Sequence, residues 1–159
     1  MKIGIIVYSQ TGNTYSVALQ LKEKLAAAGH AAEIERVTAT GNVSPGSKNF
    51  QLDTRPAVDS YDALVFAAPV QGFFLSPAMA TYLEQLPSLR DKTVACFVTK
   101  GLPFYWTGGN QAVGRMKKIC ESKGAVVCGT EIVNWNSRRD LIIKECVGRL
   151  NSLFKFKYI

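Results

Sequence analysis

Apolar runs alternate with helical patterns from one end of the chain to the other. Five runs have the length and composition of strands that are buried on both faces. The predicted strands are Ile3–Tyr8, Ala32–Val37, Ala63–Ala68, Thr93–Thr99 and Ala125–Val133. Because buried strands that alternate with helices are typical of parallel sheets, the pattern predicts an α/β fold with helices on both faces of one sheet.

Four segments between and after these strands carry apolar residues at three- and four-residue spacing, which predicts helices. Their expected inner faces are Ala18, Leu21, Leu25 and Ala28; Met79, Leu83 and Leu86; Val113, Met116 and Cys120; and Ile142, Cys146, Leu150 and Leu153. Gly29 and Gly124 are expected helix stops, and Ser76-Pro77 is an expected helix start. Ser137 and Asp140 resemble a capping box for the last helix.

Residues 38–60 are rich in glycine, proline and serine, which predicts an irregular surface connection. The chain shows no internal repeat. Its 159 residues are expected to form one domain over residues 1–159.

Composition narrows the class of protein. The longest apolar runs are far shorter than the roughly 18 residues of a membrane span, and the first run is too short for a signal peptide. We therefore expect a cytoplasmic protein without a membrane span. The four cysteines form no CxxC pair and there is one histidine, so we expect no metal site and reduced, buried thiols.

The net charge of +7 is concentrated near the end of the chain. Residues 1–113 carry nine Lys and Arg against eight Asp and Glu, whereas residues 114–159 carry ten against four. Such a basic region can attract an acidic protein, an anionic membrane surface or nucleic acid, or it can be the solvated face of two helices. No nucleic-acid-binding motif is present, so we expect no nucleic-acid partner.

The first candidate site is the loop SQTGNT between the first strand and the first helix. A helix N-terminus attracts anions through its free N–H groups and its dipole. The loop adds neutral donors without a lysine, so it is neither a nucleoside-triphosphate loop nor a GxGxxG dinucleotide loop. Its composition predicts a phosphomonoester site made by Ser9, Gln10, Thr11, Gly12, Asn13 and Thr14.

Two further loops leave strands at the same predicted edge of the sheet. They are candidate site loops, because ligands of open α/β sheets bind at the carboxyl ends of the strands. The loop after the third strand contains Pro69, Val70, Gln71, Gly72, Phe73 and Phe74. The loop after the fourth strand contains Thr99, Lys100, Gly101, Tyr105, Trp106, Gly108 and Gly109. Three consecutive aromatic residues, Phe104 to Trp106, can hardly all be core, so Tyr105 or Trp106 is expected to face a ligand.

These three loops together resemble those of the flavodoxin-like family. The pattern [ST]-x-T-G-x-T after an N-terminal strand is similar to the family's loop for the phosphate of FMN. YDALVFAAPVQGFFLSPAM (Tyr61–Met79) resembles its second flavin loop, and TKGLPFYWTGGNQA (Thr99–Ala112) its third, especially in the quinone-reductase-like and short-chain branches. The resemblance implies a five-stranded doubly wound parallel sheet of order 2-1-3-4-5, FMN as the cofactor, and the residues of the three loops as its contacts. It also implies that the peptide at Gly72 can face N5 of the flavin.

The resemblance implies a redox flavoprotein, either a one-electron shuttle or an NAD(P)H-dependent reductase. The alternative is a flavodoxin-like regulatory or interaction module without catalysis. FMN supplies the chemistry in the first case, so no catalytic side chain and no metal are expected. The expected partner is a redox protein, for which the basic surface favours an acidic one, or a small-molecule acceptor. We expect a monomer or a homodimer.

Overall fold

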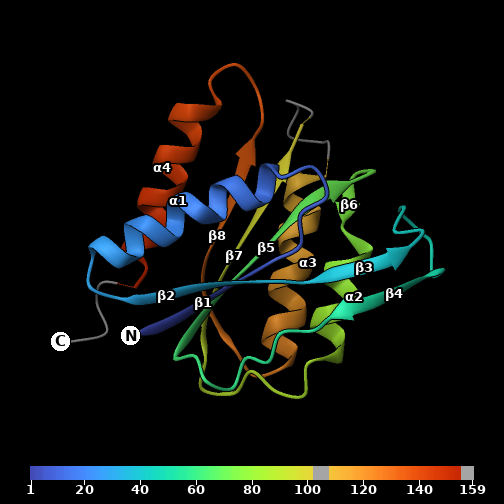
Figure 1. Cartoon of the computed structure of the whole chain (residues 1–159), viewed down its shortest axis with the longest axis horizontal. Coiled ribbons are helices and arrows are strands. Elements are labelled where there is room, and N and C mark those ends of the chain that lie inside the picture. The colour runs from blue at the N-terminus through green and yellow to red at the C-terminus, as the bar shows by residue number, and fades with distance from the viewer. Residues whose placement is uncertain (102–107, 155–159) are drawn as a thin grey trace.

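The computed structural model describes residues 1–101 and 108–154, and these residues build a central sheet covered by helices (Figure 1). Five parallel strands lie in the order β2-β1-β5-β7-β8, and the short strand β6 pairs antiparallel with β5. The strand bounds are β1 (Lys2–Val7), β2 (Ala31–Arg36), β5 (Ala63–Gln71), β6 (Phe74–Leu75), β7 (Thr93–Lys100) and β8 (Val126–Asn134). The predicted fold class and the strand order 2-1-3-4-5 are confirmed.

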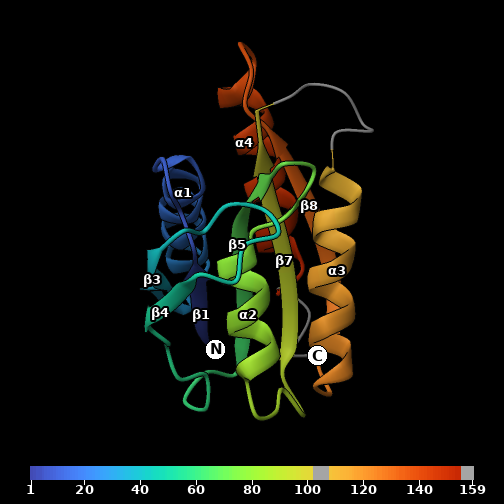
Figure 2. The ribbon, with the colours of Figure 1, turned by 90° about the vertical axis from the view of Figure 1, so that its right-hand side faces the viewer.

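Helices cover both faces of the sheet (Figure 2). Helices α1 (Asn13–Ala27) and α4 (Arg139–Ser152) pack on one face, and α2 (Pro77–Gln85) and α3 (Gly109–Ser122) pack on the other. Successive residues of β1 point to opposite faces, because side chains alternate along a strand. Ile5 and Val7 therefore join the core beneath α1 and α4, whereas Ile6 joins the core beneath α2 and α3.

The segment 38–60 corrects the sequence prediction, because it contains an antiparallel hairpin. Strand β3 (Thr38–Gly41) pairs with β4 (Phe50–Thr54), and the side chains of Leu52, Phe50 and Ala39 pack against the core beneath α2 and α3. Alternation puts Leu52 inside, with polar neighbours on either side exposed. The glycine, proline and serine residues that suggested an irregular connection are confined mainly to the loop 42–49 between the two strands.

Three of the four predicted helices begin and end close to the expected residues. Gly29 and Gly124 follow the ends of α1 and α3 in the left-handed conformation, with φ of 94° and 97°. Ser76 is the N-cap of α2 and Pro77 its first residue, although the Ser76 hydroxyl makes no capping bond.

The predicted start of α4 is wrong. Its N-cap is Arg138 rather than Ser137, because a turn centred on Asn136 occupies this segment. The Asn136 Oδ1 accepts a hydrogen bond from the Arg138 N–H at 2.8 Å, and its carbonyl accepts one from the Arg139 N–H at 3.1 Å. The buried residues of α4 are Ile143, Cys146, Val147, Leu150 and Asn151, whereas Ile142 and Leu153 are only partly buried.

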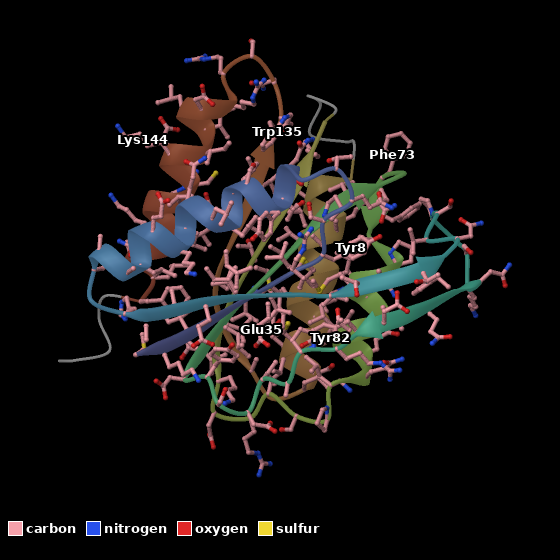
Figure 3. All side chains as sticks on the ribbon, in the orientation of Figure 1. Tyr8, Glu35, Phe73, Tyr82, Trp135 and Lys144 are labelled. Carbon is pink, nitrogen blue, oxygen red and sulfur yellow. The ribbon has the colours of Figure 1, made fainter. Side chains whose placement is uncertain are left out.

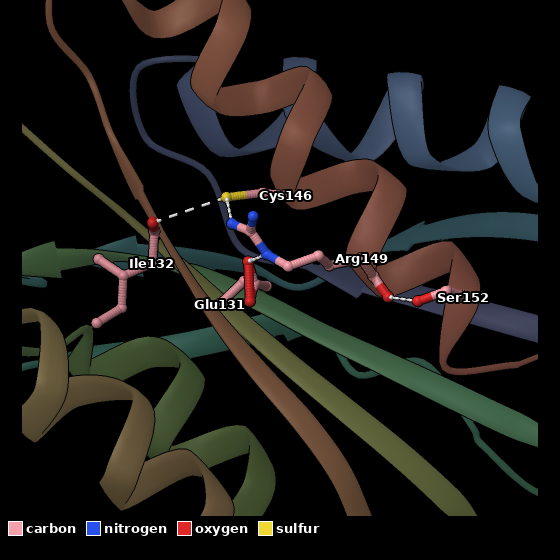
Figure 4. Close-up of polar contacts among 5 residues, drawn as sticks. All are labelled: Glu131, Ile132, Cys146, Arg149 and Ser152. Carbon is pink, nitrogen blue, oxygen red and sulfur yellow. Dashed lines mark hydrogen bonds and ion pairs between the residues drawn. The ribbon is translucent and has the colours of Figure 1, made fainter.

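A polar cluster joins α4 to the edge strand β8 (Figure 4). The Arg149 Nε donates to Glu131 Oε1 at 2.6 Å, and its Nη2 donates to the Cys146 Sγ at 3.4 Å. Burial and the nearby Glu131 carboxylate raise the pKa of the Cys146 thiol to about 11, so this thiol stays protonated at neutral pH.

Within residues 1–101 and 108–154, no helix is long and apolar enough to cross a bilayer.

Candidate functional site

A cavity of about 160 Å³ lies where the carboxyl ends of the parallel strands meet the loops that follow them. Three loops that are far apart in the sequence contribute to it, together with one residue after β8. The lining residues are Gln10, Thr11, Asn13, Pro69, Val70, Gln71, Thr99, Lys100, Gly101 and Trp135. This is the place where open α/β sheets bind their ligands.

The first loop is closed by its own serine. The Ser9 Oγ accepts hydrogen bonds from the N–H groups of Gly12, at 3.1 Å, and Tyr15, at 3.4 Å. Gly12 is the N-cap of α1 with a φ of 90°. The N–H groups of Asn13 and Thr14 belong to the first turn of α1, where the helix offers no carbonyl partner. The helix dipole adds about half a positive charge at this end, which makes the loop attractive to anions.

A buried hydrogen bond connects the first loop to the end of β7. The hydroxyl groups of Thr14 and Thr99 lie 2.8 Å apart, and both side chains are buried. This bond fixes the start of α1 relative to β7, which is separated from β1 in the sheet by β5. Thr14 therefore supports the cavity without lining it, whereas Thr99 does both.

A lysine at the end of β7 is one of the residues that line the cavity. Lys100 is the last residue of the strand and only 6% exposed. Its aliphatic stem packs against Gly109, where an added Cβ would lie 3.2 Å from the lysine Cδ. Burial lowers the pKa of the Lys100 ammonium, because desolvation disfavours the charged form. The first loop has no cation of its own, and Lys100 is the basic residue among the described residues that line the cavity.

The second loop turns between β5 and β6 with two consecutive residues at positive φ. Gly72 has a φ of 53° and Phe73 a φ of 71°, as in the tight turns that join antiparallel strands. A bulky residue at positive φ is an outlier that its surroundings must hold in place. The Phe73 side chain is 45% exposed and projects beyond the end of the ribbon (Figure 3).

The third loop touches this turn through its backbone. A Cβ added at Gly108, which has a φ of 97°, would lie 2.2 Å from the carbonyl oxygen of Phe73. Only a residue without a side chain fits there. Gly108 therefore allows the second and third loops to come together, and it packs directly against the backbone of Phe73, the residue with positive φ.

The structure sorts the predicted site residues into two groups. Nine of them line the cavity: Gln10, Thr11, Asn13, Pro69, Val70, Gln71, Thr99, Lys100 and Gly101. Eight others lie in the same loops without lining it: Ser9, Gly12, Thr14, Gly72, Phe73, Phe74, Gly108 and Gly109. Tyr105 and Trp106 lie outside the described residues.

Sequence reasoning missed Trp135, which lines the cavity. Its backbone N–H donates to the carbonyl of Lys100 at 2.8 Å, and the Arg139 guanidinium lies 5.8 Å from the centre of its ring. Trp135 comes directly after the fifth strand of the predicted parallel sheet (Figure 3). The rule that directed attention to the ends of the other strands could have found it.

The hairpin loop is a second neighbour of the site that the sequence did not reveal. The Gln71 Nε2 donates to the carbonyl of Val43 at 3.4 Å. The Gln71 Oε1 is buried and has no hydrogen-bond partner within the described part of the chain. A buried acceptor without a partner is costly, so this atom is available to a ligand hydroxyl or N–H group.

Strand order and cavity location define a doubly wound α/β protein with a candidate ligand site at the carboxyl edge of its sheet. Comparison with known proteins makes the class more specific. Residues 1–139 match the family model described as NADPH-dependent FMN reductase. The flavodoxin of Megasphaera elsdenii is 31% identical over 132 residues, which cover 83% of this chain and 85% of that protein.

Solved flavodoxin structures share the fold. Oxidised flavodoxin 1 from Bacillus cereus superimposes with a TM-score of 0.68 at 16% identity and covers 97% of each chain. The two-electron reduced flavodoxin of Megasphaera elsdenii gives a TM-score of 0.63 at 25% identity over 92% of this chain and 98% of that one. The chain belongs to the flavodoxin-like FMN-binding family, and the protein is an FMN-binding redox flavoprotein.

Proposed function

We propose that the cavity at the carboxyl edge holds the phosphate end of FMN and that the protein exchanges electrons with an acidic redox partner. The observation that carries the first part is the convergence of the α1 N-terminus, the polar side chains of Thr11 and Asn13, and the buried Lys100 on one cavity. These groups are all suited to a doubly charged phosphate.

The cavity fits the phosphate end of the cofactor in size and in chemistry. A volume of about 160 Å³ is smaller than the roughly 300–1,000 Å³ of whole ligand pockets, which suits the phosphate and its nearest carbons rather than the entire cofactor. The Gln71 Oε1, which has no partner among residues 1–101 and 108–154, would accept a hydrogen bond from a hydroxyl or ring N–H of the ligand. The exposed Phe73 and the Gly72 peptide are our proposed contacts for the ring system, together with Tyr105 or Trp106.

Bound FMN supplies one- and two-electron transfer, and the chain's own residues bind and position it. Thr11 and Asn13 would donate hydrogen bonds to the phosphate, and Lys100 would offset part of its charge. The Thr14–Thr99 hydrogen bond would hold the first loop and β7 in register. Among the described lining residues, Lys100 is the one with an ionisable side chain, which agrees with redox chemistry that needs no catalytic acid or base.

The positive charge of helices α3 and α4 supports the proposal that the redox partner is acidic. Exposed cations on or directly before α3 and α4 are Arg115, Lys117, Lys118, Arg138, Arg139, Lys144 and Arg149. Arg138 and Arg139 follow β8 closely and so lie near the end of the sheet that carries the cavity. A positive surface beside a redox site accelerates association with an acidic protein by electrostatic steering. The four cysteines are free thiols, which favours a reducing compartment such as the cytoplasm.

Titration of the apoprotein with FMN and riboflavin tests the phosphate site. Several charge-assisted hydrogen bonds, at roughly 1.5–3 kcal/mol each, should make FMN bind at least about 100-fold more tightly than riboflavin. A Lys100→Met variant should reduce this ratio, whereas Lys22→Met, which removes an exposed lysine on α1, should leave it unchanged. Equal affinity for FMN and riboflavin in the wild-type protein would contradict the proposal.

A further inference from the structure

A second and larger cavity lies on the α2 side of the molecule. This groove has a volume of about 820 Å³. Strand β4 and the hairpin loop 42–49 form one wall, and β6 and α2 form the other; Figure 2 shows the hairpin beside α2. The hairpin that makes the first wall is the segment expected to be irregular. The groove is lined by different residues from those of the cavity at the carboxyl edge.

Hydrogen bonds hold the two walls together near both ends of the groove. Near one end, the Gln71 side chain donates to the Val43 carbonyl at 3.4 Å. Near the other, the Tyr82 hydroxyl donates to the Pro56 carbonyl at 2.5 Å, and the Arg55 Nη1 donates to the Gln85 Oε1 at 3.5 Å. The groove is thus formed by the folded chain itself, which lowers the cost of ordering it around a ligand.

The deeper part of the groove is apolar. Leu52 and Leu75 are buried lining residues, and Phe50 and Phe74 line it from the two opposite walls. Phe74 is 59% exposed, although a phenylalanine normally buries its ring. Flat aromatic side chains gain from stacking on a flat ligand beyond the apolar area that is buried.

The charged residues of the groove are unbalanced. Lys48, Arg55 and Arg115 line it, against one carboxylate, Glu84, among the described lining residues. That carboxylate is paired with Arg115, whose Nη2 lies 3.2 Å from the Glu84 Oε1. Two cations, Lys48 and Arg55, remain in excess, so an anionic ligand is favoured and a cationic one is repelled.

We propose that this groove is a binding site for a small planar aromatic anion, with the ring system between Phe50 and Phe74 and its carboxylate or sulfonate at Lys48 and Arg55. The volume lies within the range of roughly 300–1,000 Å³ of small-molecule sites. Binding there does not require FMN. Phe74 is separated from Gly72 by one residue, so the ligand would contact the same segment that carries the second flavin loop.

The probe for this site is 1-anilinonaphthalene-8-sulfonate, whose fluorescence rises in an apolar site, with uncharged N-phenyl-1-naphthylamine as the comparison. We expect one saturable sulfonate probe per chain, in the FMN-free and FMN-loaded protein alike. The Lys48→Gln/Arg55→Gln double variant should weaken its binding about tenfold or more, the scale of a lost charge-assisted bond. The Thr81→Trp variant, which places an indole in the groove, should abolish it.

Matched controls separate the groove from general effects. The Lys22→Gln/Lys24→Gln variant removes the same charge from exposed positions on α1, outside the groove, and should bind the sulfonate probe as the wild type does. The uncharged probe should be insensitive to the Lys48 and Arg55 substitutions. FMN titration and the thermal midpoint of each variant report the flavin site and the fold separately. The proposal is overturned if folded Lys48→Gln/Arg55→Gln and Thr81→Trp proteins bind the sulfonate probe with wild-type affinity, or if the α1 control loses as much affinity as the groove variant.

Discussion

The contact between Gly108 and the Phe73 peptide is the feature of the site most open to a quantitative test. Substituting alanine for Gly108 introduces a Cβ at 2.2 Å from the Phe73 carbonyl oxygen and forces an L-residue to a φ of 97°. Both effects destabilise the folded protein, and other glycines of the chain separate them.

The expected cost is the sum of a conformational and a steric contribution. A left-handed conformation costs alanine roughly 1–2 kcal/mol. Overpacking a site whose neighbour is backbone costs roughly 1–3 kcal/mol, because the backbone cannot move aside as a flexible side chain can. Gly108→Ala should therefore lower the free energy of unfolding by about 2–5 kcal/mol, a large share of the roughly 5–15 kcal/mol of a typical domain.

Two control variants isolate the contributions. Gly29 has a φ of 94° with no atom within 4 Å of an added Cβ, so Gly29→Ala should cost only the conformational part, about 1–2 kcal/mol. Gly114 lies within α3, at ordinary helical φ and with no atom within 4 Å of an added Cβ, so Gly114→Ala should stabilise the protein by about 0.5–1 kcal/mol.

Urea denaturation of the FMN-free protein measures all three variants on one scale. The expected order of stability is Gly114→Ala, wild type, Gly29→Ala, Gly108→Ala. FMN titration should show weakened binding for Gly108→Ala alone, because this variant displaces the turn at Phe73. If Gly108→Ala costs no more than Gly29→Ala, the described backbone contact is refuted.

Three further predictions follow from the charges and the turn. The Lys117→Glu/Lys118→Glu variant should slow stopped-flow association with an acidic redox partner and flatten its salt dependence, since exposed charges are screened over about 8 Å at physiological ionic strength; rates that ignore both salt and the variant would contradict steering. Burial, followed by the nearby terminal ammonium, lowers the pKa of His30. The unfolded chain therefore binds more protons just below pH 6.5, so stability should fall as pH drops from about 6.5 toward the folded pKa, and His30→Gln should flatten this slope in urea titrations at several pH values. Gly72→Ala should destabilise the one-electron form of the flavin by roughly 1–2 kcal/mol, which moves the two one-electron potentials by about 40–90 mV each in opposite directions and so changes their spacing by about 90–170 mV. An added Cβ would also meet the Pro45 Cγ at 2.8 Å, so the same spacing change in Gly72→Ala/Pro45→Ala would assign the effect to the peptide rather than to this clash.

The central strands β1, β5 and β7 could be predicted from the sequence because each is a nearly continuous apolar run that is buried on both faces. The edge strands β2 and β8 contain Glu33, Glu35 and Glu131 and are only partly buried, so their signal in the sequence is weaker. The edge of the sheet that carries the site followed from the same reasoning, since parallel strands bring their carboxyl ends together. The hairpin could not be predicted in this way. β4 buries a single leucine, Leu52, and the signal of alternation in five residues is weaker than the surrounding glycine, proline and serine.

The individual roles within the first loop also depended on tertiary structure. Ser9 and Thr14 have the same hydroxyl chemistry as Thr11, and the sequence assigned all three to the ligand. The structure uses Ser9 to close the loop and Thr14 to bond β7, which leaves Thr11 and Asn13 in the cavity. Lys100 was a predicted contact. Trp135 could have been predicted only by also considering the end of the fifth strand, which lies at the same edge of the sheet.

The hydrogen bond between Thr14 and Thr99 links the first loop of the proposed phosphate site to the end of β7. One of the two hydroxyls donates to the other, so the pair has one free hydrogen, and a ligand that recruits both hydroxyls as donors must break the bond between them. Thr99 is the residue before Lys100, so such a rearrangement acts on the strand end that holds the cation. A ligand that breaks this bond would release the start of α1 from the end of β7, so binding at the first loop and the order of this strand end would be coupled.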